Sequence, residues 1–234
     1  MSLQDLGLHG ATDLAGTRGL GGGRPAGAPR NVMRLAALRW DRIHVGQIET
    51  GRLVLQAIDR ESASILLDRR RPPGVVFAPG YPSQFSLETM GLVVGTQAPG
   101  RFGPFFMVRK ADGAVIGEIG CSIDEAAATG HVGYSVVAPL WGQGYATEAL
   151  RALLDHVLAQ PEVGRVIGHT MVDHTASRRV MEKAGMLYRG ERAAIEDGEL
   201  IDLAVYEARQ HPGSLGGYWM LDRASSGHPP ASPV

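Results

Sequence analysis

Two glycines separate an apolar strand from an amphipathic helix between residues 131 and 158, and this arrangement limits the possible folds more than any other part of the sequence. The loop reads Pro139-Leu-Trp-Gly-Gln-Gly-Tyr-Ala146. Glycine has no Cβ, so the backbone there can approach a ligand closely, and the unpaired N–H groups of a first helical turn attract an anion. The loop therefore predicts a pyrophosphate site. A tight strand-to-helix turn without a ligand is the alternative interpretation.

The helix after this loop has one continuous apolar stripe, which indicates that it packs against a sheet. The stripe consists of Ala146, Ala149, Leu150, Leu153, Leu154, Val157 and Leu158. Pro161 follows it and marks the end of the helix.

The elements around this segment predict a mixed α/β fold without repeats. Asp112-Gly113 lies between two apolar strands and favours a type I′ turn, and Asp59 and Gly185 are expected to begin and end helices. The other expected strands are 52–57, 104–109, 115–123, 163–171 and 203–206, and the other expected helices follow Asp59 or cover 85–94 and 175–184.

Composition divides the chain of 234 residues into three parts. Residues 1–47 are rich in Gly and Arg and lack apolar periodicity, so we expect a mobile extension. Residues 48–208 form the predicted domain, and the Gly-, Ser- and Pro-rich residues 209–234 form a predicted flexible tail.

Charge and cysteine content exclude several classes of function. The 23 Lys and Arg balance 24 Asp and Glu, so no overall field favours nucleic acid or an anionic membrane. Cys121 is the single cysteine, which excludes a disulfide framework and a cysteine-rich zinc site, and we expect it to be a buried apolar residue. The histidines show no metal-ligand spacing, and no apolar run is long enough to cross a membrane. We therefore expect a cytoplasmic protein without a metal.

Several spaced motifs resemble the GNAT superfamily of acetyl-CoA-dependent N-acetyltransferases, in particular the branch of ribosomal-protein N-terminal acetyltransferases. They are Gly133-Tyr134, the segment from Trp141 to Ala149, and the segment from Asp173 to Gly185. The resemblance implies a mixed sheet with splayed central strands, flanked by helices, that holds the pantetheine arm of acetyl-CoA. It implies a coenzyme site formed by Val136, Val137, Trp141, Gly142, Gln143, Gly144, Tyr145, Ala146 and His174.

The resemblance also suggests catalytic groups, although this chain departs from the family pattern near them. His131 stands where many relatives carry a glutamate, and a neutral imidazole can act as a general base. Ser177 matches a serine that relatives use near the thiolate, whereas Met181 replaces a tyrosine and cannot donate a proton. His174 replaces an asparagine that holds pantetheine. For His131 and Ser177 a purely structural role is the alternative.

The resemblance implies an enzyme that transfers acetyl from acetyl-CoA directly to a primary amine. The acceptor is either a small molecule or a protein N-terminus, and the enzyme is a monomer or a homodimer. The alternative is a catalytically degenerate module that senses acyl-CoA, because the family's glutamate and tyrosine are missing at His131 and Met181.

Overall fold

Among the residues that the structure describes, a central sheet of nine strands is flanked by four α-helices. The computed structural model describes residues 47–95, 101–196 and 199–210. These residues confirm the predicted mixed α/β fold. The predicted extension lies outside the described residues except for Gln47, and so does the predicted tail beyond residue 210.

The strands are β1 (Ile48–Glu49), β2 (Leu53–Ala57), β3 (Val76–Phe77), β4 (Phe105–Arg109), β5 (Ala114–Asp124), β6 (Thr129–Val136), β7 (Arg165–Met171), β8 (Leu187–Glu196) and β9 (Glu199–Arg209). The helices are α1 (Arg60–Leu67), α2 (Gln84–Gly95), α3 (Tyr145–Leu158) and α4 (Thr175–Lys183), and a short 3₁₀ helix covers Ala138–Leu140.

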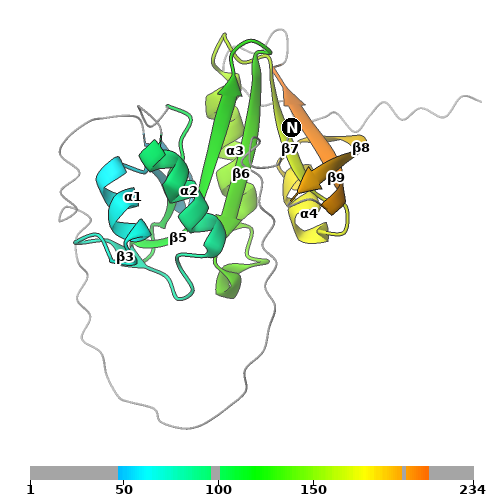
Figure 1. Cartoon of the computed structure of the whole chain (residues 1–234). Helices are drawn as coiled ribbons and strands as arrows, with labels where there is room; N and C mark the ends of the chain where they lie inside the picture. Colours follow the sequence, from blue (N-terminus) through cyan, green and yellow to red (C-terminus); the bar gives the residue numbers. More distant parts are fainter. Residues whose placement is uncertain (1–46, 96–100, 197–198, 211–234) are drawn as a thin grey trace, which may run out of the picture.

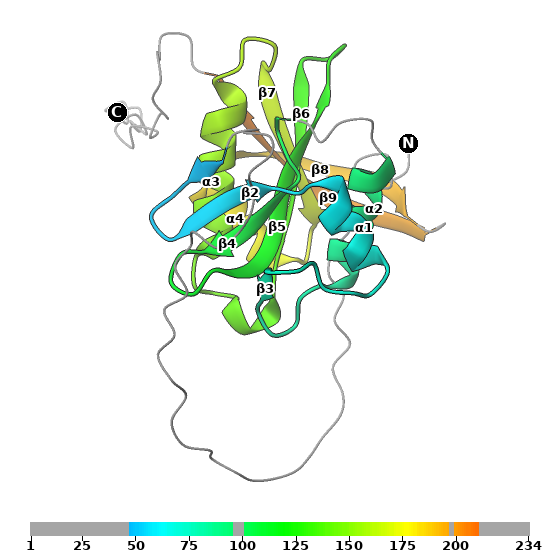
Figure 2. The same cartoon turned by 90° about the vertical axis from the view of Figure 1, so that its left-hand side faces the viewer.

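The sheet has the order β1-β2-β4-β5-β6-β7-β9-β8, and β3 pairs with β5 at its side. Helices α1 and α2 cover one face and α3 and α4 the opposite face, as the view along the sheet shows (Figure 2). Most neighbouring strands are antiparallel, but β6 and β7 run parallel because α3 connects them.

The parallel pair separates halfway along its length. Ladder pairs join Thr129 to Arg165 and continue only as far as Val132 and Gly168, although both strands extend beyond these residues. The two strands diverge from this point (Figure 1). The splay that the family resemblance implied is therefore present in the centre of the sheet.

Local sequence signals explain most of the element boundaries. The Asp59 carboxylate accepts a hydrogen bond from the Ser62 N–H at 2.7 Å and caps α1. Gly185 has φ +92° and lies just after α4. The expected type I′ turn is wrong: Gly113 has φ +70°, but Asp112 does not have a positive φ. The hairpin loop covers residues 110–113, and a loop of this length needs only one left-handed residue.

The apolar stripe of α3 packs into the main core, with Ala149, Leu150, Leu153, Leu154 and Val157 buried. The predicted strand 203–206 is the centre of the longer β9, which pairs along its length with β8. Strand β8 was missed because its polar run 189–192 breaks the alternation that indicates a strand.

Candidate functional site

A cleft of about 510 Å³ opens where β6 and β7 separate. Its walls come from the second half of β6, the end of β7, the glycine loop and α4, with Phe85 of α2 and Leu203 of β9 at its margin. Among the residues predicted for the site, it is lined by Val136, Trp141, Gly142, Gly144, Tyr145, Ala146, His174 and Ser177. His131, Val137 and Gln143 do not line it.

The glycine loop presents a row of backbone donors to the cleft. Gly142 and Gly144 have φ +72° and +81°, a left-handed conformation that other residues adopt only with strain, and Gly144 is the N-cap of α3. Within the described part of the chain, the N–H groups of residues 142–147 have no hydrogen-bond acceptor. The positive end of the α3 dipole lies at the same place. The loop can therefore bind an anion without rearrangement.

Arg52, the residue just before β2, contacts the glycine loop and holds it in place. Its guanidinium donates to the Gln143 carbonyl oxygen at 3.0 Å and to Glu148 Oε2 at 2.6 Å. It also lies 4.4 Å from the centre of the Tyr145 ring. Gln143 thus supports the loop by its backbone instead of lining the cleft. No local sequence signal could have found this contact, because residues 52 and 143 are far apart in the chain.

The splayed edge of β6 supplies a second set of backbone groups. The Val137 N–H donates to the Ile116 carbonyl oxygen at 2.9 Å, so the backbone N–H of Val137 points towards β5. The Val137 side chain is buried. Alternate residues of a strand direct their backbone groups to opposite neighbours, so the N–H groups of Tyr134 and Val136 face the gap beside β7. They lie beyond the last β6–β7 ladder pair.

His131 of β6 stacks on His169 of β7, with the ring centres 6.1 Å apart and the planes inclined by 11°. Each Nδ1 atom is buried and has no hydrogen-bond partner among the described residues. Burial lowers the pKa of His131, and burial followed by the charge of Arg192 lowers the pKa of His169 to about 4. Both rings are therefore neutral at pH 7. His169 lines the cleft and was missed as a site residue.

Ser177 of α4 forms a hydroxyl pair with Tyr134 of β6, with 2.8 Å between the two oxygens. The Tyr134 hydroxyl also lies 3.2 Å from the Ser177 carbonyl oxygen. Burial raises the pKa of Tyr134, so its hydroxyl stays protonated. Both residues line the cleft, whereas Met181 is buried in the core. Position 181, where relatives carry a tyrosine, offers no hydroxyl, but Tyr134 places an aromatic hydroxyl on the opposite wall of the cleft.

His174 precedes α4, and its Nδ1 lies 3.2 Å from the Thr170 hydroxyl. This contact orients the ring at the edge of the cleft.

A buried carboxyl group, Glu118 of β5, lies beside the cleft. Its Oε1 accepts hydrogen bonds from the hydroxyls of Ser135 on β6 at 2.5 Å and Ser86 on α2 at 3.1 Å. Its Oε2 has no partner among the described residues. Burial raises the pKa of Glu118 to about 7, because exclusion of water disfavours the charged form more than the hydrogen bonds from neighbouring hydroxyls favour it. The carboxyl group connects α2 to the cleft wall, since Ser135 lines the cleft.

Three further observations concern the cysteine, metal binding and membrane spans. Cys121 is buried, as expected, and burial raises the pKa of its thiol to about 12. In the described ranges, no three or more His, Cys, Asp or Glu side chains are grouped to hold a metal ion. No helix within those ranges has the length and hydrophobicity to span a membrane.

The fold and the cleft are those of an acetyltransferase. The family model for the acetyltransferase (GNAT) domain matches residues 52–187, so the chain belongs to the GNAT family. Among curated proteins it is similar to the N-acetyltransferase p20 of Bacillus licheniformis, itself described as uncharacterised. The two are 25% identical over 167 residues, which is 67% of this chain and 92% of that protein.

Solved structures show the same fold. RimL, a ribosomal L7/L12 α-N-protein acetyltransferase in complex with coenzyme A, aligns with a TM-score of 0.53 and 18% identity over 70% of this chain and 98% of its own. The microcin C7 self-immunity acetyltransferase MccE, in complex with acetyl-CoA and AMP, aligns with a TM-score of 0.52 and 18% identity over 68% and 93%.

Proposed function

We propose that this protein transfers the acetyl group of acetyl-CoA to a primary amine by direct attack of the amine on the thioester. The observation that carries the proposal is the continuity of the cleft. It begins at the unpaired N–H groups of residues 142–147, passes between β6 and β7, and reaches His169. The name of the p20 relative and the coenzymes bound to RimL and MccE support the same chemistry.

The residues present fit coenzyme A along its length. The loop amides and the cationic side chains of Arg179 and Lys183 at the same wall suit its phosphates. The N–H groups of Tyr134 and Val136 that face the gap suit the amides of its pantetheine arm, as an added strand would, whereas the Val136 carbonyl oxygen already accepts a hydrogen bond from the Trp141 indole. His174 offers one further hydrogen-bonding nitrogen at this edge.

Direct transfer needs one proton acceptor and one proton donor. The amine nitrogen forms a bond to the carbonyl carbon while its proton passes through water to the neutral imidazole of His131, which does not itself line the cleft. The carbon–sulfur bond then breaks, and the Ser177 hydroxyl gives its proton to the thiolate while Tyr134 donates a hydrogen bond to the Ser177 oxygen. Water then returns a proton to Ser177 and takes up the proton held by His131, which restores both groups. The stacked His169 can assist His131 because it lines the cleft itself.

The proposal is tested by incubating the protein with acetyl-CoA and a panel of primary amines that includes short peptides. Thiol release together with an acetylated product, identified by mass spectrometry, supports it. Binding of acetyl-CoA without thiol release across the panel favours the acyl-CoA sensor instead. Mass spectrometry of protein N-termini from cells with and without the gene then separates a protein acceptor from a small amine.

A further inference from the structure

One face of the strands β7, β9 and β8 carries a row of basic side chains. Side chains of directly paired residues lie on the same face of a sheet. Between β7 and β9, Arg165 pairs with Arg209, His169 with Val205, and Met171 with Leu203. Leu203 in turn pairs with Arg192 on β8, so the side chains of Arg165, Arg209 and Arg192 lie on one face. The row therefore lies on the face that also carries His131 and His169.

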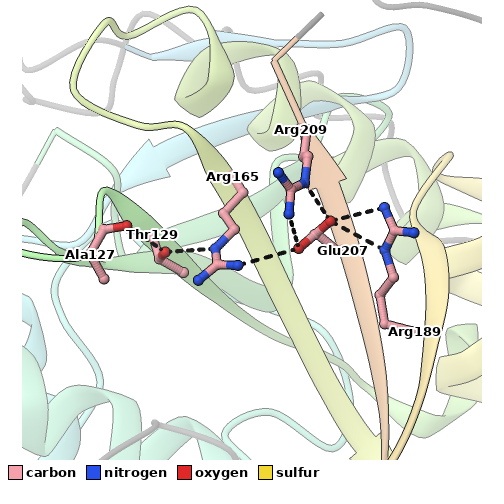
Figure 3. A network of polar contacts seen from close by, with 6 residues as sticks. All are labelled: Ala127, Thr129, Arg165, Arg189, Glu207 and Arg209. Atoms are coloured by element: carbon pink, nitrogen blue, oxygen red, sulfur yellow. Dashed lines mark hydrogen bonds and ion pairs between the residues drawn. The ribbon is translucent and has the colours of Figure 1, made fainter.

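Glu207 on this face is surrounded by arginines, as Figure 3 shows. Its carboxylate is 3.0 Å from Arg189 Nη2, 2.6 Å from Arg209 Nε and 3.6 Å from Arg165 Nη1. Glu207 is buried, whereas the three guanidinium groups are partly exposed. Three guanidinium groups thus share one buried carboxylate on this face of the sheet.

Arg192 adds a fourth positive charge closer to the cleft. It is exposed and forms no ion pair or hydrogen bond within the described part of the chain. Its ladder neighbour Leu203 and the next residue across, Met171, both line the cleft. Two strand spacings, about 10 Å, separate the Cα atoms of Arg192 and Met171, and an arginine side chain can bridge most of this distance.

Arg192 lies close enough to His169 and His131, the two histidines at the proposed site of proton transfer, for its charge to affect both. After burial, it is the largest influence that lowers the pKa of His169, and it lowers the pKa of His131 as well. Asp124 acts on His131 in the opposite direction. Arg192 does not itself line the cleft, but its guanidinium lies next to residues that do. A guanidinium in this place suits a carboxylate, which it can bind through two parallel hydrogen bonds.

We propose that Arg192 binds an anionic group of the acceptor, so that the preferred acceptors are primary amines carrying a carboxylate on the same molecule. This inference rests on the proposed amine acetylation.

The test compares acceptors that differ only in charge. One pair is the tetrapeptide amide Ala-Glu-Ala-Ala and its Gln counterpart, and the other is γ-aminobutyrate and its amide. We expect kcat/KM to be about 5- to 10-fold higher for the charged member of at least one pair, mainly through KM. A preference within the peptide pair alone indicates a protein N-terminus, and one within the small pair alone indicates a small amine. Equal values within both pairs would overturn the inference.

Variants locate the effect. Arg192→Gln should bring the ratio of kcat/KM within a pair close to one, and Arg192→Glu should invert it. Arg71→Gln is the matched control, because it removes one exposed positive charge beyond the end of α1 and should keep the preference. An unchanged preference in Arg192→Gln would show that this residue is not the anion site.

Calorimetric titration of the same peptide pair separates failure of this inference from failure of the proposed function. If no acceptor releases thiol, acetylation is wrong, but tighter binding of the Glu peptide to the wild type than to Arg192→Gln still supports the anion site. Equal binding of both peptides to the wild type, together with equal binding of γ-aminobutyrate and its amide, refutes it.

Discussion

Glu118→Gln should remove a pH dependence of stability that a buried carboxyl group imposes on this fold. Burial raises the pKa of Glu118 from 4.5 to about 7 in the folded protein. Below about pH 4.5 both the folded and the unfolded chain hold this proton. As the pH rises towards 7, the unfolded chain releases it first, so the folded state loses stability through this window. Above about pH 7 the loss is complete.

The magnitude follows from the two pKa values. At about 1.4 kcal/mol per tenfold change in proton affinity, raising the pKa from 4.5 to about 7 corresponds to about 3 kcal/mol of unfolding free energy. Glutamine has nearly the same shape and no titratable proton. The variant should therefore be about 3 kcal/mol more stable relative to the wild type at pH 8 than it is at pH 4.5.

Urea unfolding followed by circular dichroism, at pH values from 4.5 to 8, measures this difference. Glu125→Gln, at an exposed turn after β5, is the control and should follow the wild-type curve. All other groups titrate alike in the three proteins, so only the difference between the curves is interpreted. Parallel curves for the wild type and Glu118→Gln would refute the raised pKa.

Three further predictions concern the proposed reaction. His131→Ala should lower kcat by about 10²- to 10⁴-fold with little change in the KM for acetyl-CoA, and a near-normal rate at pH 7 would remove His131 from the mechanism. Gly144→Val should weaken coenzyme A binding at least about 10-fold by calorimetry, because a branched side chain at φ +81° strains the anion loop. Unaltered affinity would contradict the placement of the phosphates. Ser177→Ala should lower kcat, because the thiolate of coenzyme A then leaves without its proton donor. Thr175→Ala, on the exposed side of the same helix, serves as the control. Equal rates in both variants would exclude Ser177 as the proton donor.

The sequence by itself determined the local elements around the loop. Glycines at 142 and 144, the apolar stripe of α3 and the helix end at Gly185 are decided by neighbouring residues, because backbone conformation and helix periodicity depend on the nearest positions in the chain. The same locality explains one error. The Asp112-Gly113 pair suggested a two-residue turn, but the register of β4 against β5 placed four residues in the loop.

Only the tertiary structure decided which side chains meet at the cleft. The stacking of His131 on His169, the pairing of Tyr134 with Ser177 and the burial of Glu118 between two serines each join different elements. Such contacts depend on strand order, register and the point where β6 and β7 separate, and no stretch of sequence encodes these locally. The glycine loop could thus be predicted from the sequence as an anion site, and the family resemblance suggested His131 and Ser177. Their neighbours His169 and Tyr134, and the charge of Arg192 beside the histidines, became visible only once the strands were placed side by side.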